Sequence, residues 1–514
     1  MGCSPYFYFS IAVMAFGGIP KGYDEGGFSG SVNLISFRND FQLTTEEWLN
    51  QSHSLANRLG NIRSFAVLGA AFGALLTLSL NGWMSRLNVY RTGVVVWTIG
   101  LLIQIFSSGM LGLLLFARLF SGLGMGVLTV ACPVYIAEIA PARIRGISIA
   151  VYMVVLLFFL SAGFFINYAA SVMLPPTHLQ YRLVQAIPLA PVGVAFCACF
   201  FLHGTPRELL IRGNVLEAAI QLARLRGKSV ESEEVREELQ AILSHVEPRH
   251  TVVRTETTLG KWWRKLKTLC TNESMRKRTL LILLLQILAQ WSGGNGITYI
   301  IPTVFQYAGI HRTSAALLTS GVYGLVKLFV TIIFAVVLID VIGRRRCFIS
   351  GLLLQLFGHV YLTVYTNLTH AGSDVPLKIT PSASRGAVAS VFIYAIGWSV
   401  GLCTIPYIYP VEIFPTSLRS NAMGLSMFSH WVCQFLVVKT SPLLLVTLNV
   451  WGGFLFFGSM CVVGLIVLTL MAPETRAVPL ECIDQLFEEK WYKMGWARSH
   501  ELRNQDSLTE PVEK

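Results

Sequence analysis

Long apolar runs alternate with short polar stretches along almost the whole chain. The runs are about 20 residues long, which is the length that a helix needs to cross about 30 Å of hydrocarbon. They predict twelve membrane helices, at 6–33, 63–83, 92–109, 112–138, 147–168, 183–203, 279–308, 314–341, 346–366, 386–411, 420–440 and 449–471. The pattern therefore predicts an all-α, multi-pass protein of the lipid bilayer.

One long polar stretch divides these helices into two groups of six. It contains the segments LEAAIQLARLRG and SEEVREELQAILSHV, in which charged residues alternate with apolar ones at helical spacing. We therefore expect an N-terminal six-helix half over 1–203, a cytosolic loop with short helices over 204–278, a C-terminal six-helix half over 279–471, and a cytosolic tail over 472–514.

The charge of the chain follows this topology. The sequence is 54% hydrophobic and 13% charged, with a formal net charge of +12. Its basic residues gather on one side of the predicted helices, among them Arg86, Arg145, Arg344 and Arg419. The positive-inside rule places that side in the cytosol, together with both termini. We interpret the positive charge as topology, and we expect no nucleic-acid partner.

Short motifs at the chain surface add little to this orientation. Asn50 and Asn367 begin Asn-x-Ser/Thr sequences on the non-cytosolic side and are candidate glycosylation sites. Such matches often arise by chance, and a third, at Asn272, falls on the cytosolic side. The N-terminus enters an apolar run without a basic segment and a small-residue cleavage site, so it predicts a membrane helix rather than a cleavable signal.

The cysteines and polar motifs indicate no catalytic chemistry. Ten cysteines are scattered singly, mostly within apolar runs, with no CxxC pair and no metal-ligand spacing. The chain also lacks a recognisable phosphate-binding loop or a nucleophile with its base. We therefore expect neither a metal, nor a cofactor, nor an enzyme.

Lys327 is the only charged residue in the apolar stretch 320–339. An ammonium at the centre of a membrane helix costs roughly 2.5–3.5 kcal/mol on insertion scales, so such a residue usually faces a wet cavity or a counter-ion. The position indicates a negatively charged small-molecule substrate. A structural role would instead require a side chain that extends to the membrane surface or a fixed pair with a carboxylate.

The two halves contain an internal repeat. EIAPARIRG, beginning at Glu138, and EIFPTSLRS, beginning at Glu412, align without gaps at a separation of 274 residues, and Arg145 aligns with Arg419. Two six-helix halves with matching loops are typical of transporters whose substrate site lies near the bilayer midplane. The repeat favours transport over catalysis.

Several motifs, in order along nearly the whole chain, resemble the sugar porter family of the major facilitator superfamily. They are KGYDEGGFSG (21–30), RLFSGLGMG (118–126), the two loops just quoted, QWSGGNGITY (290–299), DVIGRRR (340–346) and PETRAVPLECIDQLF (473–487). The last segment is most similar to fungal members of the quinate permease type. The resemblance implies the major facilitator fold and secondary active transport across the plasma membrane.

The chain departs from sugar-binding members at three positions. Met153 and Ala289 stand where those members carry glutamines, and Lys327 stands where they carry an asparagine. A neutral hexose depends on many hydrogen bonds, whereas a hydroxylated carboxylate depends on a neutralising cation. The departures favour an organic acid such as quinate over a sugar. The resemblance and the remaining polar and aromatic residues predict a substrate site formed by Lys327, Gln286, Gln290, Asn295, Tyr299, Trp291, Tyr407, Trp431 and Gln434.

Most of these residues could also serve the structure alone. Gln286, Gln290 and Asn295 could hydrogen-bond neighbouring helices, as membrane-buried amides often do. The aromatic residues could serve only in packing.

Asp24 and Arg118 lie in two membrane helices of the first half, and the resemblance assigns the pair to proton coupling. A carboxylate beside an arginine in a partly dry cavity can load and release a proton as the cavity opens and closes, so we expect proton symport. A static clamp between the two helices is the alternative. Lys21 and Glu25 are four residues apart and could pair with each other, which would leave Asp24 to Arg118.

The repeated loops predict a cytoplasmic gate. Its expected members are Glu138, Arg145, Asp340, Arg344, Arg345, Glu412 and Arg419. In the first half, HGTPR (203–207) has Gly204 where the second half has a glutamate, which predicts a weaker gate on that side. The weaker gate makes an exporter of an acidic metabolite a candidate beside an importer. A hexose transporter and a non-transporting nutrient sensor are two further candidates.

Overall fold

The computed structural model describes most of the chain. The described residues are 4–43, 52–141, 144–244, 267, 269, 271–334, 342–370, 380–414, 418–475, 486–487 and 490–496. Asn50 and Asp340, two residues with predicted roles, lie outside them, as does the side chain of Arg419.

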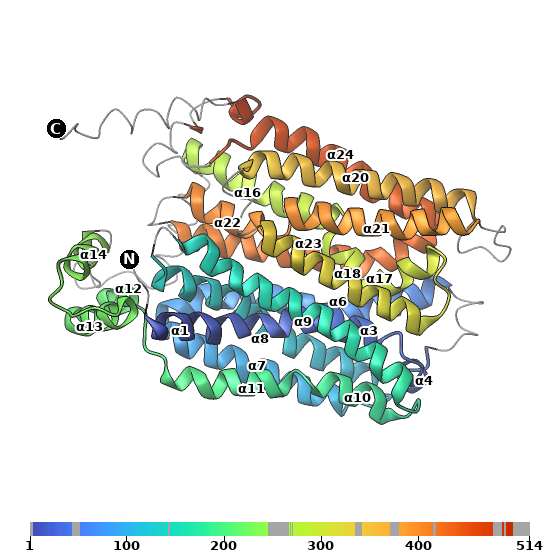
Figure 1. Cartoon of the computed structure of the whole chain (residues 1–514), viewed down its shortest axis with the longest axis horizontal. Coiled ribbons are helices and arrows are strands. Elements are labelled where there is room, and N and C mark those ends of the chain that lie inside the picture. Colours follow the sequence, from blue (N-terminus) through green and yellow to red (C-terminus); the bar gives the residue numbers. More distant parts are fainter. Residues whose placement is uncertain are drawn as a thin grey trace. The chain divides into compact units, whose positions relative to one another are not determined.

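The regular structure of the described residues is helical throughout (Figure 1). Eleven helices in these ranges are long and apolar enough to cross a membrane. The prediction of an all-α, multi-pass membrane protein is confirmed. The chain divides into two compact units, which comprise residues 1–46 with 61–264 and residues 47–60 with 265–514.

Unit 1 contains the first group of helices. They are α1 (Pro5–Ala15), η1 (Phe16–Gly18), α2 (Ile19–Tyr23), η2 (Asp24–Phe28), α3 (Ser29–Ser31), α4 (Ile35–Asp40), α6 (Ser52–Trp83, from residue 61), α7 (Arg86–Ile105), α8 (Leu111–Ile139), α9 (Arg145–Met173), α10 (His178–Ala186), α11 (Leu189–Ala198), η4 (Cys199–Phe201), α12 (Pro206–Ile211), α13 (Val215–Arg226) and α14 (Glu233–Ser244).

The first membrane segment is not the continuous α-helix predicted over 6–33. It is a run of short pieces in which η1 is a 3₁₀ turn and η2, DEGGF, is a π turn. Paired glycines lie in both places, and they lower the cost of irregular helical backbone because they have no side chain. Gly22 and Gly26 also pack so tightly on α9 that a Cβ atom would come within 2.0 and 1.9 Å of the carbonyl oxygens of Leu156 and Leu160.

The second membrane helix begins earlier than predicted. The hydropathy pattern gave 63–83, whereas α6 begins at Ser52. His53, Asn57 and Arg58 lower the hydropathy of the first three turns, so an apolar window excludes them. The extension places Arg63 in the interior of a helix rather than at its start.

Unit 2 contains the second group of helices. They are α16 (Glu273–Trp291), α17 (Gly294–Tyr307), α18 (Thr313–Ile333), α20 (Arg344–Leu368), α21 (Pro381–Gly401), α22 (Ile405–Ile413), α23 (Arg419–Thr447), α24 (Asn449–Met471) and the turn η6 (Met494–Trp496).

Two predicted helices of unit 2 are interrupted. The segment predicted over 279–308 breaks between α16 and α17 at Gly293, whose φ of +94° is in the left-handed region that favours glycine. The segment predicted over 386–411 breaks between α21 and α22. A break in a membrane helix leaves backbone groups free to bond outside their own helix, which is why such breaks often mark substrate sites.

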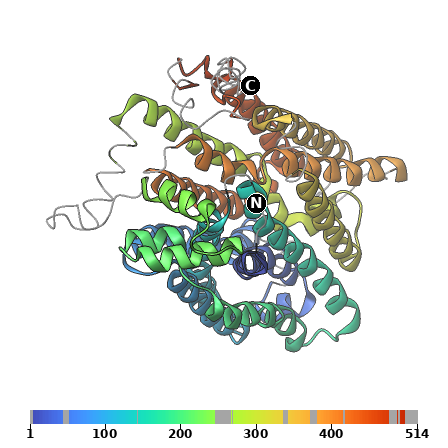
Figure 2. The same ribbon diagram turned by 60° about the vertical axis from the view of Figure 1, so that its left-hand side comes forward.

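The short helices after α11 belong to unit 1. The hydroxyl of Ser4, at the start of α1, donates to the carbonyl oxygen of Leu225 at 3.0 Å, and the Arg226 guanidinium donates to the Ile139 carbonyl of α8 at 3.1 Å. Figures 1 and 2 show these helices, in green, at the end of unit 1 where the chain begins. The expected short helices within 204–278 are thus present in the described part of that stretch.

Candidate functional sites

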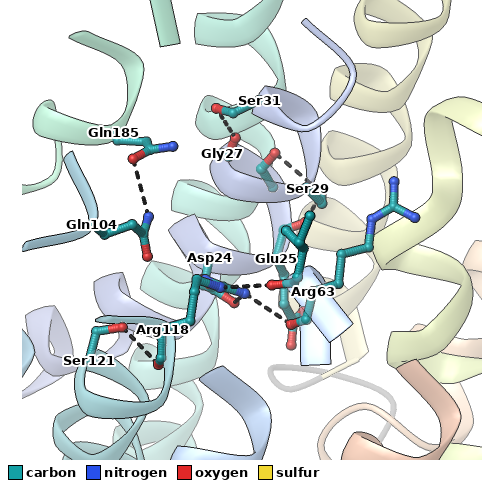
Figure 3. A network of polar contacts seen from close by, with 12 residues as sticks. Asp24, Glu25, Gly27, Ser29, Ser31, Arg63, Gln104, Arg118, Ser121 and Gln185 are labelled. Carbon is teal, nitrogen blue, oxygen red and sulfur yellow. Dashed lines mark hydrogen bonds and ion pairs between the residues drawn. The ribbon is translucent and has the colours of Figure 1, made fainter. Parts of the chain in front are cut away.

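Unit 1 buries a group of charged side chains. Asp24, the first residue of the π turn, forms an ion pair with Arg118 of α8, and a second contact joins Arg118 Nη2 to Asp24 Oδ2 at 3.3 Å. The Arg118 guanidinium also stacks 3.7 Å from the centre of the Phe28 ring. Figure 3 shows the two side chains facing each other. The structure brings together the two residues that the sequence predicts as a pair.

Arg118 also holds the backbone of α6. Its Nε donates to the carbonyl oxygen of Ile62 at 3.1 Å, and its Nη2 donates to that of Arg63 at 2.9 Å. The Arg118 guanidinium therefore joins the first membrane segment to α6. Among these three partners of Arg118, Asp24 is the one that can be protonated, so its contact alone can be weakened by a proton.

Three more charged residues are buried beside this pair. Lys21, Glu25 and Arg63 have exposed fractions of 4%, 1% and 3%. Lys21 and Glu25 lie on the same run as Asp24, and their predicted pairing stays a prediction. Arg63 is a residue that the sequence analysis missed. The extent of α6 was the signal needed to find it, because only a helix that starts near residue 52 buries position 63.

Unit 2 buries Lys327 completely, with an exposed fraction of 0%. Its Nζ donates to the hydroxyl of Thr298 on α17 at 3.2 Å. The same nitrogen lies 4.0 Å from the centre of the Trp398 ring and 5.4 Å from that of Tyr323. Cation–π contact with two aromatic rings stabilises an ammonium away from water. The residue does not extend to the membrane surface, so one of the two structural roles considered for it is excluded.

A hydrogen-bonded set of side chains surrounds His430 of α23. Its Nδ1 lies 2.9 Å from Gln286 Oε1 and 3.1 Å from Gln290 Nε2, and its Nε2 lies 3.3 Å from the hydroxyl of Tyr407. Gln286 also donates to the hydroxyl of Ser426 at 2.9 Å. Two predicted amides and one predicted aromatic residue thus meet at a histidine that the sequence analysis missed.

The sequence did contain a signal for His430. Ser426, His430 and Gln434 recur at intervals of four, which puts three polar side chains on one face of an apolar helix. All three are buried, and Gln434 accepts a hydrogen bond from Asn295 at 3.1 Å. A polar stripe of this kind inside a membrane helix is typical of a site or a helix contact.

The remaining predicted aromatic residues divide into two groups. Tyr299 and Trp431 are both buried with exposed fractions of 1%, and the Trp431 ring packs edge-on against His430. Trp291 instead packs against Phe456 of α24, at 5.7 Å between ring centres. The structure therefore brings Trp431 to the polar set and places Trp291 in a different contact.

The predicted gate residues of unit 2 lie at the start of α20, where Glu474 caps the helix. Arg344 pairs with Glu412 at 2.8 Å, and Thr475 donates to the same carboxylate at 2.7 Å. The two oxygens of Glu474 accept from the backbone N–H groups of Arg344 and Arg345 at 3.0 and 3.2 Å. A carboxylate at the N-terminus of a helix satisfies unpaired donors and complements the helix dipole.

Unit 1 has a matching arrangement. Arg86, the first residue of α7, pairs with Glu138 at 3.1 Å, and Thr205 donates to Glu138 at 2.6 Å. Glu208 accepts from the backbone N–H of Arg86 at 3.1 Å. Arg145 lies instead among the charges of Arg207, Arg226 and Glu238.

The predicted weakness of this gate is therefore corrected by Glu208. Thr205 caps α12 and accepts from the Glu208 N–H at 3.2 Å, so the TPRE sequence forms the first turn that places Glu208 near α7. Burial raises the pKa of Glu208, and the hydrogen bond from Arg86 opposes that rise. The carboxylate missing at Gly204 is supplied four residues later.

Most of the chain matches a family model. The model is described as "Sugar (and other) transporter" and matches residues 10–487. The chain belongs to the sugar transporter family. It is therefore a secondary transporter of small molecules and an integral, multi-pass membrane protein, and the prediction of a transporter rather than an enzyme is confirmed.

Curated relatives within this family include fungal proteins. A "Probable quinate permease" of Aspergillus niger is 30% identical over 494 residues, which cover 94% of this chain and 88% of the relative. A "Quinate permease" of Emericella nidulans is 28% identical, with coverage of 94% and 89%. The resemblance to sugar porters of the fungal quinate permease type is confirmed at this level.

Comparison with solved structures establishes the fold. The major facilitator superfamily proton:xylose symporter XylE, bound to 6-bromo-6-deoxy-D-glucose, matches with a TM-score of 0.74 at 22% identity, covering 94% of this chain and 99% of that one. The inward-open conformation of XylE from E. coli gives a TM-score of 0.70 at 20% identity, with coverage of 94% and 100%. The predicted major facilitator fold is confirmed.

Proposed function

We propose that this member of the sugar transporter family is a proton symporter that imports a hydroxylated carboxylate such as quinate. We place it in the plasma membrane with both termini in the cytosol, as the basic loops predict. The buried Lys327 is the observation that carries the choice of an acid over a neutral sugar. The names of the fungal relatives support the same choice.

Lys327 is the proposed anchor for the carboxylate. Its nitrogen contacts the hydroxyl of Thr298 and the rings of Trp398 and Tyr323, and a hydroxyl or an aromatic ring is a weaker partner for an ammonium than a carboxylate is. A substrate carboxylate would replace part of this shell by a charge-assisted hydrogen bond in a low-dielectric site. The hydrogen bond to Thr298 of α17 then holds the ammonium of Lys327, which α18 carries, in position.

The amides of unit 2 are the proposed partners of the substrate hydroxyls. Gln286, Gln290 and Asn295 supply donors and acceptors on one side, and Gln434 and His430 supply them from α23. These groups bond to one another in the described structure, so a polyol could exchange bonds with them at little cost. Tyr299, Tyr407, Trp431 and Trp291 are the proposed aromatic walls.

The Asp24–Arg118 pair is the proposed proton site. Asp24 contacts Arg118 from α8, and Lys21 and Glu25 are buried on its own run. Protonation of Asp24 removes the charge that holds Arg118, and Arg118 also holds the α6 backbone. Loading a proton therefore weakens a link between two membrane segments, which is the kind of step that alternating access requires.

The paired carboxylates and arginines at the ends of α7 and α20 are the proposed cytoplasmic gate. Glu138, Arg145, Arg344, Arg345, Glu412 and Arg419 are its members, together with Glu208 and Glu474. Asp340 is also a predicted member and lies outside the described residues. Glu208 supplies the carboxylate that Gly204 lacks, which weakens the argument for an exporter.

Glycosylation at Asn50 and Asn367 stays a prediction. The side chain of Asn367 is exposed at the end of α20, which is compatible with a modified position. Asn50 lies outside the described residues.

Uptake of labelled quinate against labelled glucose tests the proposal. The protein is expressed in a host that lacks its own carriers, and uptake is measured at about pH 5 and about pH 7.5. Quinate should enter faster at the lower pH and glucose should not compete. Lys327→Asn should lower the specificity constant for quinate by about tenfold or more, because a charge-assisted hydrogen bond is worth roughly 1.5–3 kcal/mol.

Thr298→Val is the matched control, because it removes one neutral contact of Lys327 and leaves the charge. It should reduce quinate uptake much less than Lys327→Asn does. Saturable uptake of glucose without uptake of quinate would instead identify a hexose transporter. Absence of quinate uptake at both pH values, in cells where the protein reaches the membrane, would reject the proposal.

A further inference from the structure

We propose that Arg63 is a second anion-binding residue, which holds the carboxylate of an organic acid in unit 1 at a different stage of transport from Lys327 in unit 2. The identity of that acid rests on the proposed function. The binding of an organic anion by Arg63 does not, because it follows from the burial and the contacts of the residue itself.

Arg63 is buried in α6 without an ionic partner in the described part of the chain. Its exposed fraction is 3%, and its Nε has no hydrogen-bond acceptor. Figure 3 shows its guanidinium turned away from the Asp24–Arg118 pair. Several other arginines also have an Nε without an acceptor, but Arg63 combines this with burial and with no ion pair among the described residues. A buried guanidinium without a counter-charge is costly, so such a residue is normally kept for a function.

The charges around Arg63 make the binding of an anion there more favourable. Lys21, Arg63 and Arg118 are the buried cations of this region, and Asp24 and Glu25 are its carboxylates. Three positive charges against two negative ones leave an excess of one positive charge. Arg38 of α4 adds a further charge that repels Arg63.

Arg38 itself is satisfied by the protein and does not compete for the same ligand. Its Nη2 donates to Asn33 Oδ1 at 3.2 Å, and its Nε donates to the carbonyl oxygen of Val32 at 3.4 Å. Arg118 is likewise engaged by Asp24 and by two carbonyl groups. Arg63 is therefore the arginine of the three that is best placed to receive an external anion.

A carboxylate is the anion that fits this residue. The guanidinium is planar and presents parallel N–H donors that match the two oxygens of a carboxylate. Arg63 is also linked to the proton site, because its carbonyl oxygen accepts from the guanidinium that pairs with Asp24. Any movement of Arg118 is transmitted to the part of α6 that carries Arg63.

Through this link, the binding of a proton at Asp24 and the binding of an anion at Arg63 should favour each other. When Asp24 is protonated, the excess charge of the region rises from one to two, which favours an anion at Arg63. By thermodynamic reciprocity, an anion at Arg63 favours the proton on Asp24. Other described groups packed on this run include Asn167 of α9 and the carbonyl of Val184 of α10, together with the titratable side chains of Tyr90, Cys132 and Tyr152 near Gly17 and Gly18.

Anion binding to the purified full-length protein tests the inference without transport. Thermal unfolding is followed while quinate, gluconate or sulfate is added, with glucose as a neutral compound. At least one of the two carboxylates should stabilise the wild type in a saturable way. Arg63→Gln should weaken that apparent affinity by about tenfold or more, since charge-assisted bonds are lost. Arg38→Gln is the matched control and should change it by less than about threefold.

A second variant covers the case in which Arg63→Gln does not fold. Arg63→Lys keeps the charge and loses the planar fork, so it should bind the carboxylate several-fold more weakly than the wild type. Unchanged carboxylate affinity in either folded variant would overturn the proposal. The same conclusion would follow if no anion stabilised the wild type.

The outcome separates this inference from the proposed function. If anions stabilise the protein through Arg63 but the uptake assay fails, the transport proposal falls and the anion site stands. If quinate is taken up and Arg63→Gln binds it as tightly as the wild type does, the transport proposal stands and the anion site falls.

Discussion

The two units of the molecule bury polar groups of different kinds. Unit 1 buries charges, with Asp24 and Arg118 in contact and Lys21, Glu25 and Arg63 beside them. Unit 2 buries neutral amides and a histidine that bond to one another, and among its described residues it also buries two cations, Lys327 and Arg278. The two halves share a repeat, yet their interiors differ in chemistry.

The difference suggests a division of labour under the proposed function. Charged groups in a dry interior respond strongly to the gain of a proton, because each proton changes the balance of a low-dielectric region. Neutral amides respond little to protons but read the positions of hydroxyl groups well. Proton coupling would thus belong to unit 1, and recognition of the substrate hydroxyls to unit 2.

The largest change in transport is expected from a substitution at Asp24, in the charged interior of unit 1. Asp24→Asn keeps the shape of the side chain and cannot exchange a proton, so uptake against a gradient should be lost. Each pH unit across the membrane drives about a tenfold concentration ratio per proton, and the variant should lose this factor. Accumulation of labelled quinate in vesicles with an imposed pH gradient measures it, and exchange of internal for external quinate should continue.

Asp40→Asn provides a control within the same unit. That carboxylate contacts His178 and Tyr181 at the end of α4, away from Arg118. Accumulation should remain close to that of the wild type. Uphill uptake by Asp24→Asn at the wild-type level would break the proposed division of labour.

A smaller effect is expected at His430. His430→Leu leaves the bonding groups of Gln286 and Tyr407 without this partner, at a cost of roughly 1–3 kcal/mol. The specificity constant for quinate should fall by a factor of about 5–150. The ratio of uptake at low and high pH should stay unchanged, because the proposed proton site is in the other unit.

Ser426→Ala removes only the outer bond of the same set and should have a weaker effect. Initial rates over a range of quinate concentrations distinguish the two variants. A flattened pH dependence in His430→Leu would show that unit 2 takes part in proton coupling.

The smallest effect is expected at the gate of unit 1. Burial raises the pKa of Glu208 in the folded protein above its ordinary value of about 4.3. The folded state therefore favours the protonated carboxyl, and the resulting stability is fully present below the ordinary pKa and is lost as the pH rises through the raised value. Glu208→Gln removes this contribution.

Thermal unfolding between about pH 4.5 and about pH 7 tests this sign. The wild type should lose stability relative to Glu208→Gln as the pH increases, by about 1 kcal/mol or less. Glu474→Gln is the comparison from unit 2, where the carboxylate accepts from two backbone N–H groups. Parallel curves for the wild type and Glu208→Gln would contradict the assignment.

The sequence alone predicted the features that depend on composition and repetition. The approximate positions of most membrane helices followed from hydropathy, and the Asp24–Arg118 pair followed from the family motifs. The motifs also placed Arg344 and Glu412 in one set of charged residues, without predicting that they pair. The charged pair could be predicted because a charge in a membrane helix has few acceptable environments.

Features that depend on backbone detail were not predicted. The start of α6 was hidden by polar residues, and with it the burial of Arg63. His430 was missed because a single histidine beside a tryptophan carries little signal without its neighbours on other helices. Glu208 was missed because a motif compares fixed positions, whereas a carboxylate on another turn can reach the same helix end.

The π turn at Asp24–Phe28 has a consequence for the phase of the first membrane segment. A regular α-helix rotates by about 100° per residue, so the extra residue of a π turn rotates everything after it by about that amount. Gly27 and Ser31 both contact Asn167 of α9, while Asp24 reaches Arg118 of α8. Deleting one residue from this turn would restore a regular helix, and that helix could present either Asp24 or Ser31 to its partner, but not both.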